Sequence, residues 1–204
     1  TLRAIEVLEG ADLILAEDTR HAMKLLGHYN IRSPLQSHHL ANEHRSVDAV
    51  CERILAGEKV ALITDAGTPG ISDPGFLIVR TCIQKGIPVE TLPGATALIP
   101  ALVNSGLPCE RFCFEGFLPQ KKGRTRRLGA LKDETRTLVF YESPFRLEKT
   151  LRQMAEYFGP GRRGSVSREI SKLHEENARG TLVELADHFS TKTVRGEIVI
   201  VVAG

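Results

Sequence analysis

The sequence predicts an α/β fold built from two units in tandem, and three observations favour this prediction. Short apolar runs alternate with amphipathic helical segments along the chain, which is the pattern of strands and helices in α/β proteins. A length of 204 residues suits one large domain or two small ones. Residues 105–108 contain a glycine and a proline, as is typical of a boundary. We therefore expect an N-terminal α/β domain over residues 1–107 and a C-terminal α/β domain over residues 108–204.

Apolar spacing and terminating glycines predict the individual elements. In the first domain we expect helices over residues 1–9, 43–56, 75–85 and 97–104, and strands over residues 12–16, 36–39, 59–63 and 87–92. In the second domain we expect strands over residues 111–117, 137–141, 165–170 and 196–202, and helices over residues 145–158 and 181–189. An α/β chain normally opens with a strand. We therefore expect that a strand preceding residue 1 is missing from this sequence.

The loop at residues 64–75 is the most informative stretch of the first domain. It connects an apolar strand to a helix and contains three glycines and two prolines, which keep it out of both elements and let its backbone approach a ligand. In open α/β sheets, ligands bind beyond the carboxyl ends of strands. The loop matches neither the dinucleotide fingerprint nor the P-loop. A ligand-binding loop and a tight turn without a ligand are both consistent with it.

Polar residues follow several predicted strands. Glu17, Asp18, Thr19 and Arg20 follow the first one, where they either face a binding crevice or, for Asp18 and Thr19, cap the next helix. Three histidines lie within residues 38–44, but no carboxylate or cysteine completes a recognisable metal site with them, so we expect no metal. The four cysteines show no paired spacing and are interpreted as free thiols.

Composition and charge describe a globular protein with a basic second half. Hydrophobic residues make up 42% and charged residues 25% of the chain. No apolar run approaches the ~20 residues that a membrane span needs, and no signal segment opens the sequence, so we expect a cytoplasmic protein. The net charge is −3 over residues 1–107 and +5 over residues 108–204. This asymmetry predicts a polyanionic partner for the second half.

One basic cluster stands out in that half. Five of the residues 121–127 are basic, namely Lys121, Lys122, Arg124, Arg126 and Arg127. They form either a solvated helix face or a phosphate-binding surface.

Seven segments in a fixed order resemble one known family. These are Glu17-Asp18-Thr19-Arg20, the loop from Asp65 to Gly75, Pro93-Gly94, residues 112–119 (FCFEGFLP), residues 140–146 (FYESPFR), Arg168-Glu169 and Arg195-Gly196-Glu197. Together they resemble the tetrapyrrole-methylase superfamily and, within it, the ribosomal RNA small-subunit methyltransferase I family, which 2′-O-methylates a cytidine of 16S ribosomal RNA. The similarity runs over essentially the whole chain. The family's opening strand, with its donor loop, is absent before Thr1.

The resemblance implies a two-domain class III methyltransferase, tetrapyrrole methylase-like, with S-adenosylmethionine in a cleft between the domains. It also implies a homodimer with the small ribosomal subunit as partner. The residues that it places at the donor are Asp65, Ala66, Gly67, Thr68, Ile71, Thr96, Ala97, Tyr141, Glu142 and Gly180.

The same resemblance implies methyl transfer to a ribose 2′-oxygen, a reaction that requires no metal. Candidate bases are the carboxylates Glu17, Asp18, Glu142 and Glu169. Candidate groups for orienting phosphates or holding charge on the acceptor are Arg20, Arg146 and Arg168. Each of these residues could instead form a structural ion pair. Lys121, Lys122, Arg124, Arg126 and Arg127, with Arg162 and Arg163, are expected to bind RNA. The alternatives are a tetrapyrrole C-methyltransferase, acting on precorrin or uroporphyrinogen, and a non-catalytic RNA- or ribosome-binding module.

Overall fold

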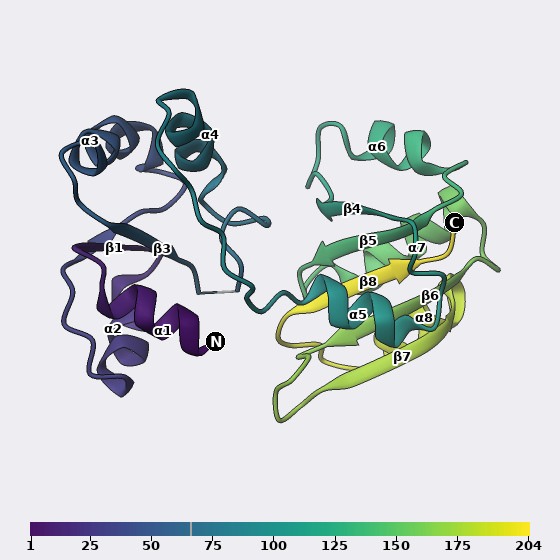
Figure 1. The fold of residues 1–204 in the computed structure, drawn as a ribbon. Helices are drawn as coiled ribbons and strands as arrows, with labels where there is room; N and C mark the ends of the chain where they lie inside the picture. The colour runs from purple at the N-terminus through teal and green to yellow at the C-terminus, as the bar shows by residue number, and fades with distance from the viewer. Residues whose placement is uncertain (66) are drawn as a thin grey trace. The chain divides into compact units, whose positions relative to one another are not determined.

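A computed structural model of the chain describes residues 1–65 and 67–204, which form two compact units, Thr1–Thr96 and Ala97–Gly204 (Figure 1). The sequence placed this boundary eleven residues later, after residue 107. The difference is helix α5 (Leu98–Ser105). Its buried residues Leu98, Ala101 and Leu102 pack with Val139 and Val199 of the second unit's sheet. Burial of this apolar face therefore assigns α5 to the second unit.

The first unit is a small parallel sheet with helices on both faces (Figure 1). Its elements are α1 (Leu2–Glu9), β1 (Leu13–Ala16), α2 (Thr19–His28), β2 (Leu35–Ser37), α3 (Glu43–Leu55), β3 (Val60–Ile63) and α4 (Phe76–Gln84). The strand order is β2-β1-β3. Strand β1 is buried along its whole length because Leu13 and Leu15 pack with α3 and α4, whereas Ile14 packs with α1 and α2.

The predicted strand over residues 87–92 is wrong, since the structure has no strand there. A strand requires a hydrogen-bonded neighbour, and the three strands of this sheet are β2, β1 and β3. Pro88 also lacks the N–H that a ladder needs. The apolar side chain of Ile87 is nevertheless buried, in the cluster beneath α3 and α4.

The second unit is a five-stranded mixed sheet with the order β4-β5-β8-β6-β7. Besides α5, its elements are β4 (Phe112–Phe117), α6 (Arg124–Leu131), β5 (Thr137–Glu142), α7 (Leu147–Phe158), β6 (Arg163–Arg168), β7 (Glu176–Thr181), α8 (Leu182–Ser190) and β8 (Ile198–Val202). Helices α6, α7 and α8 cover one face of the sheet and α5 covers the other. The sequence does not predict β7, because this edge strand consists of Glu-Asn-Ala-Arg-Gly-Thr and shows no apolar alternation.

Strand directions bring several loops to one edge within each unit. Strands β1, β2 and β3 are parallel, so the residues that follow them lie at one edge. In the second unit β4 and β5 are parallel, and β5 and β6 are both antiparallel to β8 between them. Glu142 and Arg168 are both register partners of Ile198. The ends of β4, β5 and β6 therefore share an edge as well. Among the described helices, none is long and apolar enough to span a membrane.

Candidate functional site

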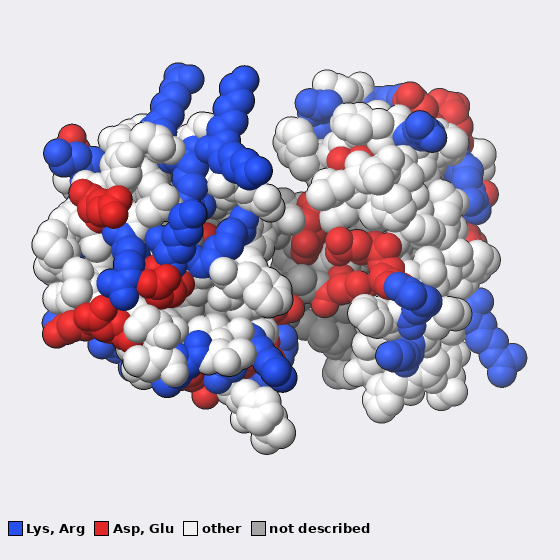
Figure 2. All heavy atoms as spheres, turned by 180° about the vertical axis from the view of Figure 1, so that it is seen from behind, with Lys and Arg blue, Asp and Glu red and all other residues white. Residues whose placement is uncertain are grey.

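The edge of the first unit's sheet collects charged residues from two strand ends. Glu17 and Asp18 follow β1, and Asp65 follows β3, whose last residue Ile63 is paired with Ala16. The predicted residues Glu17, Asp18, Arg20 and Asp65 are thus brought to one edge, as expected for the carboxyl ends of parallel strands. Figure 2 shows acidic side chains gathered on one face of this unit.

Asp18 is the N-cap of α2. Its carboxylate accepts hydrogen bonds from the Arg20 backbone N–H at 2.8 Å, from Arg20 Nε at 3.0 Å and from Arg20 Nη2 at 2.5 Å. These contacts hold the pKa of Asp18 well below its usual range. Asp18 therefore caps α2, which was one of its two predicted roles. Its carboxylate is a weak proton acceptor. The side chain of Arg20 is 82% exposed, which leaves its outer edge accessible.

Glu17 has a different environment from its neighbour. Burial raises its pKa, and the nearby carboxylates of Asp73 and Asp65 raise it further. Among the predicted carboxylates it is the one whose affinity for a proton the structure increases. A raised pKa is typical of carboxylates that exchange protons in catalysis.

His21, a residue that the sequence analysis did not select, belongs to the same edge. Its Nδ1 lies 3.1 Å from Oδ2 of Asp65. Ligand atoms of Asp18, His21 and Asp65 all lie within 4.8 Å of one another, as in a possible metal cluster, although Asp18 is already engaged by Arg20. His21 and Asp65 are 44 positions apart in the chain. Only the pairing of β1 with β3 identifies them as neighbours.

The glycine-rich loop is tied to the segment before α5. Both the backbone N–H and the hydroxyl of Thr68 donate to the Ala95 carbonyl, at 2.9 and 3.0 Å. Gly67 has φ +120°, and a Cβ at this position would lie 2.5 Å from the same carbonyl oxygen, so a larger residue does not fit. Ile71 is partly exposed. Ala66 was also predicted to contact the donor, but it lies outside the described residues.

Thr96, another predicted donor contact, carries a polar atom without a partner. Its Oγ1 is buried, and no group among the described residues forms a hydrogen bond with it. Unsatisfied buried hydroxyls are uncommon in native structures. Thr96 thus offers a ligand a hydrogen-bonding group beside a turn that admits only glycine. Ala97 follows it as the N-cap residue of α5.

Glu142 is an internal structural residue in the second unit. Its side chain is 1% exposed and accepts hydrogen bonds from the Ser143 backbone N–H at 2.7 Å, from Arg146 Nε at 2.9 Å and from Thr150 Oγ1 at 2.7 Å. These bonds occupy both carboxylate oxygens. Glu142 therefore orients Arg146 and the start of α7 and is poorly placed to accept a proton from a substrate.

The predicted basic cluster divides into internal and external residues. Arg124 is buried and donates to Gln153 Oε1 at 2.7 Å, to the Pro119 carbonyl at 3.2 Å and to Thr150 Oγ1 at 2.6 Å. Burial lowers the pKa of its guanidinium, an effect that Glu142 opposes. Arg124 therefore anchors α6 inside the unit and does not contact phosphates. The burial of Arg124 contradicts its predicted role in RNA binding, because a run of basic residues does not show which of them are buried.

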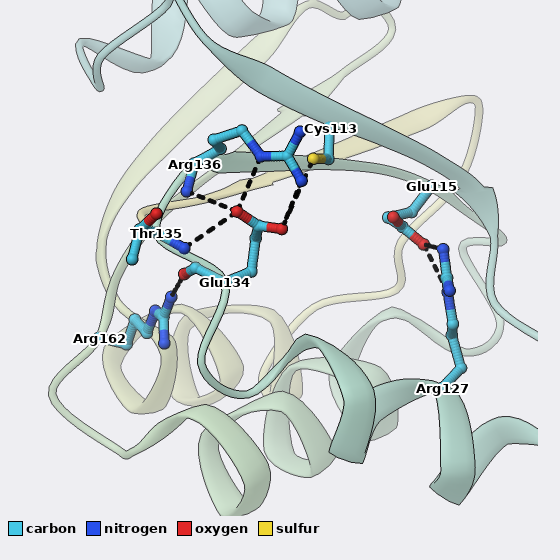
Figure 3. A network of polar contacts seen from close by, with 7 residues as sticks. All are labelled: Cys113, Glu115, Arg127, Glu134, Thr135, Arg136 and Arg162. Atoms are coloured by element: carbon cyan, nitrogen blue, oxygen red, sulfur yellow. Dashed lines mark hydrogen bonds and ion pairs between the residues drawn. The ribbon is translucent and has the colours of Figure 1, made fainter.

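Arg127 is partly engaged, since its Nε donates to Glu115 Oε2 at 2.7 Å (Figure 3). Lys121, Lys122 and Arg126 are exposed, and no described carboxylate pairs with their side chains. Arg162 is structural, because it donates to the carbonyls of Lys132, Glu134 and Ala203. Figure 3 also shows the side chain of Arg136 hydrogen-bonded to the carboxylate of Glu134. This interaction lowers the pKa of Glu134 to about 2.

Arg168 and Glu169 lie at the end of β6, on the same sheet edge as Glu142. Arg168 Nε lies 3.2 Å from Glu176 Oε2. The carboxylate of Glu169 accepts from the Glu197 backbone N–H at 2.9 Å and from Lys172 Nζ at 3.0 Å, which lowers its pKa. Glu169 is thus another weak base.

Tyr141 and Gly180 complete the predicted set in the second unit. The Tyr141 ring packs edge-on against Phe114 and Phe117, with centroids 5.0 and 5.6 Å apart. Phe117, which the sequence analysis did not select, is 52% exposed. Gly180 lies in β7, paired with Gly164, and a Cβ there would lie 2.9 Å from Glu184 Oε2.

Comparisons with known proteins agree on one family. A family model of tetrapyrrole (corrin/porphyrin) methylases matches residues 1–186. A ribosomal RNA small subunit methyltransferase I from Synechocystis sp. is 46% identical over 205 residues, covering 100% of this chain and 74% of that protein. The protein of the same name from Thermotoga maritima is 46% identical over 204 residues, covering 100% of this chain and 91% of that protein.

Solved structures share the fold at lower identity. Diphthine synthase has a TM-score of 0.73 at 11% identity, covering 100% of this chain and 84% of that one. Cobalt precorrin-4 methyltransferase has a TM-score of 0.70 at 16% identity, covering 100% and 88%. Uroporphyrin-III C-methyl transferase from Thermus thermophilus, complexed with S-adenyl homocysteine, has a TM-score of 0.62 at 18% identity, covering 98% and 90%.

The internal position of Glu142 generates a prediction about stability. Glu142→Ala leaves Arg124 and Arg146 without their buried carboxylate, so the free energy of unfolding should fall by about 3–5 kcal/mol. Glu148→Ala, which removes an exposed partner of Arg152 on the same helix, should cost less than about 1 kcal/mol. Denaturant titration of both variants checks this. Equal losses would contradict the assignment of Glu142 as a structural residue.

Proposed function

This chain belongs to the tetrapyrrole (corrin/porphyrin) methylase family, among the ribosomal RNA small subunit methyltransferases I, and from that premise we propose that it methylates 16S ribosomal RNA. It is an S-adenosylmethionine-dependent methyltransferase that acts on the 2′-oxygen of a cytidine ribose in the small subunit. The observation that carries this function is the 46% identity with a ribosomal RNA small subunit methyltransferase I over the full length of the chain.

The tetrapyrrole alternative has weaker support. Solved tetrapyrrole methyltransferases are 16–20% identical to this chain, a likeness that extends to the fold alone. The basic second half also favours a nucleic acid over a small-molecule acceptor. A non-catalytic binding module remains the second alternative, and the transfer assay below distinguishes it.

Two features of the first unit support a donor site there. Gly67 lets the loop backbone lie close to the Ala95 carbonyl, and the buried Thr96 hydroxyl has no hydrogen-bond partner among the described residues. We place the donor against Asp65, Gly67, Thr68, Ile71 and Thr96 of the first unit. When bound, S-adenosylmethionine supplies an activated methyl group on a sulfonium. The protein contributes alignment, which can be worth ~7–11 kcal/mol, and removal of the hydroxyl proton.

The RNA-binding surface lies in the second unit. Figure 2 shows lysine and arginine side chains spread over one face of this unit. We assign phosphate contacts to Lys121, Lys122 and Arg126, with Arg127 next to Arg126 on helix α6, whereas Arg163 at the start of β6 lies at the opposite edge of the sheet. The exposed ring of Phe117 offers a stacking surface for an unpaired base. In the first unit Arg20, with its exposed guanidinium, is suited to a phosphate near the acceptor ribose. Homodimerisation and a cytoplasmic location complete the proposal.

Transfer of labelled methyl groups to small ribosomal subunits tests this function directly. The full chain is incubated with labelled S-adenosylmethionine and unmethylated subunits, and the modified nucleotide is mapped by mass spectrometry of RNA fragments. We expect one label per subunit on a cytidine ribose. Label on a base carbon or on no acceptor would reject the proposal.

Gly67→Ala should weaken donor binding. The added Cβ meets the Ala95 carbonyl at 2.5 Å and displaces the loop beside Thr96. A strain of ~1–3 kcal/mol corresponds to a loss in affinity of about 5- to 150-fold, measured by calorimetry with S-adenosylmethionine. Gly57→Ala is the matched control, because Gly57 has φ +104° but no atom within 4 Å of its Cβ position. Unchanged affinity in Gly67→Ala would place the donor elsewhere.

Removal of three exposed cations should reduce the salt dependence of RNA binding. In the variant Lys121→Gln, Lys122→Gln, Arg126→Gln the log–log slope of affinity against salt should become less steep by about 2, because each single-strand phosphate contact contributes roughly 0.7. The control changes Lys24, Arg32 and Lys59 of the first unit to Gln, which removes the same charge. Equal effects of both triple variants would indicate a general charge effect and exclude a specific surface.

A further inference from the structure

We propose that His21, oriented by Asp65, is the general base that removes the proton from the acceptor ribose hydroxyl. This inference rests on the proposed function and assigns a catalytic residue for it. The sequence analysis placed only carboxylates in that role. The structure shows a histidine on the same sheet edge, at a position where a substrate can reach it.

The geometry is that of a histidine–aspartate pair. His21 Nδ1 lies 3.1 Å from Asp65 Oδ2. A carboxylate can only accept a hydrogen bond, so Nδ1 carries the proton and Nε2 keeps its lone pair. The side chain of His21 is 62% exposed, and no described residue forms a hydrogen bond with Nε2. One ring nitrogen is thus fixed by the protein while the other faces outward, the arrangement that general-base histidines require.

The rival bases are engaged elsewhere in the described structure. Asp18 is bound by three donors of Arg20, Glu169 by Lys172 and the Glu197 N–H, and Glu142 by three internal donors. Glu17 keeps a raised proton affinity, but it is only partly exposed and lies among Asp65 and Asp73. His21 combines an exposed side chain with a tautomer that Asp65 fixes.

The chemical step balances without a further reactant. The proton of the 2′-hydroxyl moves to His21 Nε2 while the oxygen lone pair forms the bond to the methyl carbon. The carbon–sulfur bond breaks, and its electron pair stays on sulfur, so the sulfonium becomes a neutral thioether. The imidazolium formed on His21 is stabilised by the Asp65 carboxylate and then releases its proton to solvent.

Charged groups surround His21. Asp65 and Asp18 carry negative charge, whereas Arg20 and the N-terminal end of α2 are positive. At the same edge Glu17 interacts with both Asp73 and Asp65. Protonated His21 cannot accept a proton, so methyl transfer should fall on the acidic side.

Three variants of the full chain test the pair. His21→Gln should lower kcat for methyl transfer by about 10²–10⁴-fold, the contribution of a positioned base, with unchanged donor affinity by calorimetry. His21→Ala should lose as much activity and regain part of it when imidazole is added. Asp65→Asn, which removes the carboxylate that holds His21 Nδ1, should show a smaller loss of kcat. His28→Gln, at the other end of α2, is the control and should keep the wild-type rate.

The outcomes separate this inference from the proposed function. Absence of transfer by the wild type would reject the function itself. Transfer by the wild type together with near-wild-type kcat in His21→Gln would overturn the assignment of the base. A loss in His21→Ala that imidazole does not restore would assign His21 a structural role and also overturn it. Inactivation of the wild type by a chelator, with recovery on adding a divalent cation, would make the pair a metal site instead.

Discussion

The parallel pairing of β1 with β3 is the constraint on which the functional edge of the first unit depends. Register pairs Ala16 with Ile63, so the polar residues that follow each strand emerge together. The hydrogen-bonded ladder holds this register, and burial of β1 on both faces prevents it from slipping. Asp18, His21 and Asp65 consequently meet, although they come from two distant segments.

In the second unit, a network of buried polar side chains holds the corresponding edge of the sheet. Arg124, Glu142 and Thr150 form an internal polar network that joins α6, β5 and α7. Such a network is stabilising only when each member is satisfied, and here hydrogen bonds reach Glu142 from three donors and leave Arg124 for three acceptors. It fixes the loop between β5 and α7, while the neighbouring Lys121, Lys122 and Arg126 remain at the surface.

Residues of one sequence motif therefore have different roles. Some stabilise the fold, and others are suited to the chemistry. Asp18 caps a helix, whereas His21 three residues later offers a free ring nitrogen. Arg124 is internal, whereas Arg126 is exposed. Family membership locates the functional region of the chain. Local burial and hydrogen bonding distinguish the roles of adjacent residues within it.

The sequence by itself determined the α/β class, the positions of most helices and strands, the family, and the polar residues that follow the strands. These features depend on apolar periodicity, on glycine and proline, and on local motifs, all of which are readable within a short window. Only the tertiary structure decided that α5 packs with the second unit, that residues 87–92 are not a strand, that Arg124 and Glu142 are internal and that His21 meets Asp65. Each of these depends on which segments become neighbours after strand pairing and burial, and that information is spread over residues tens of positions apart.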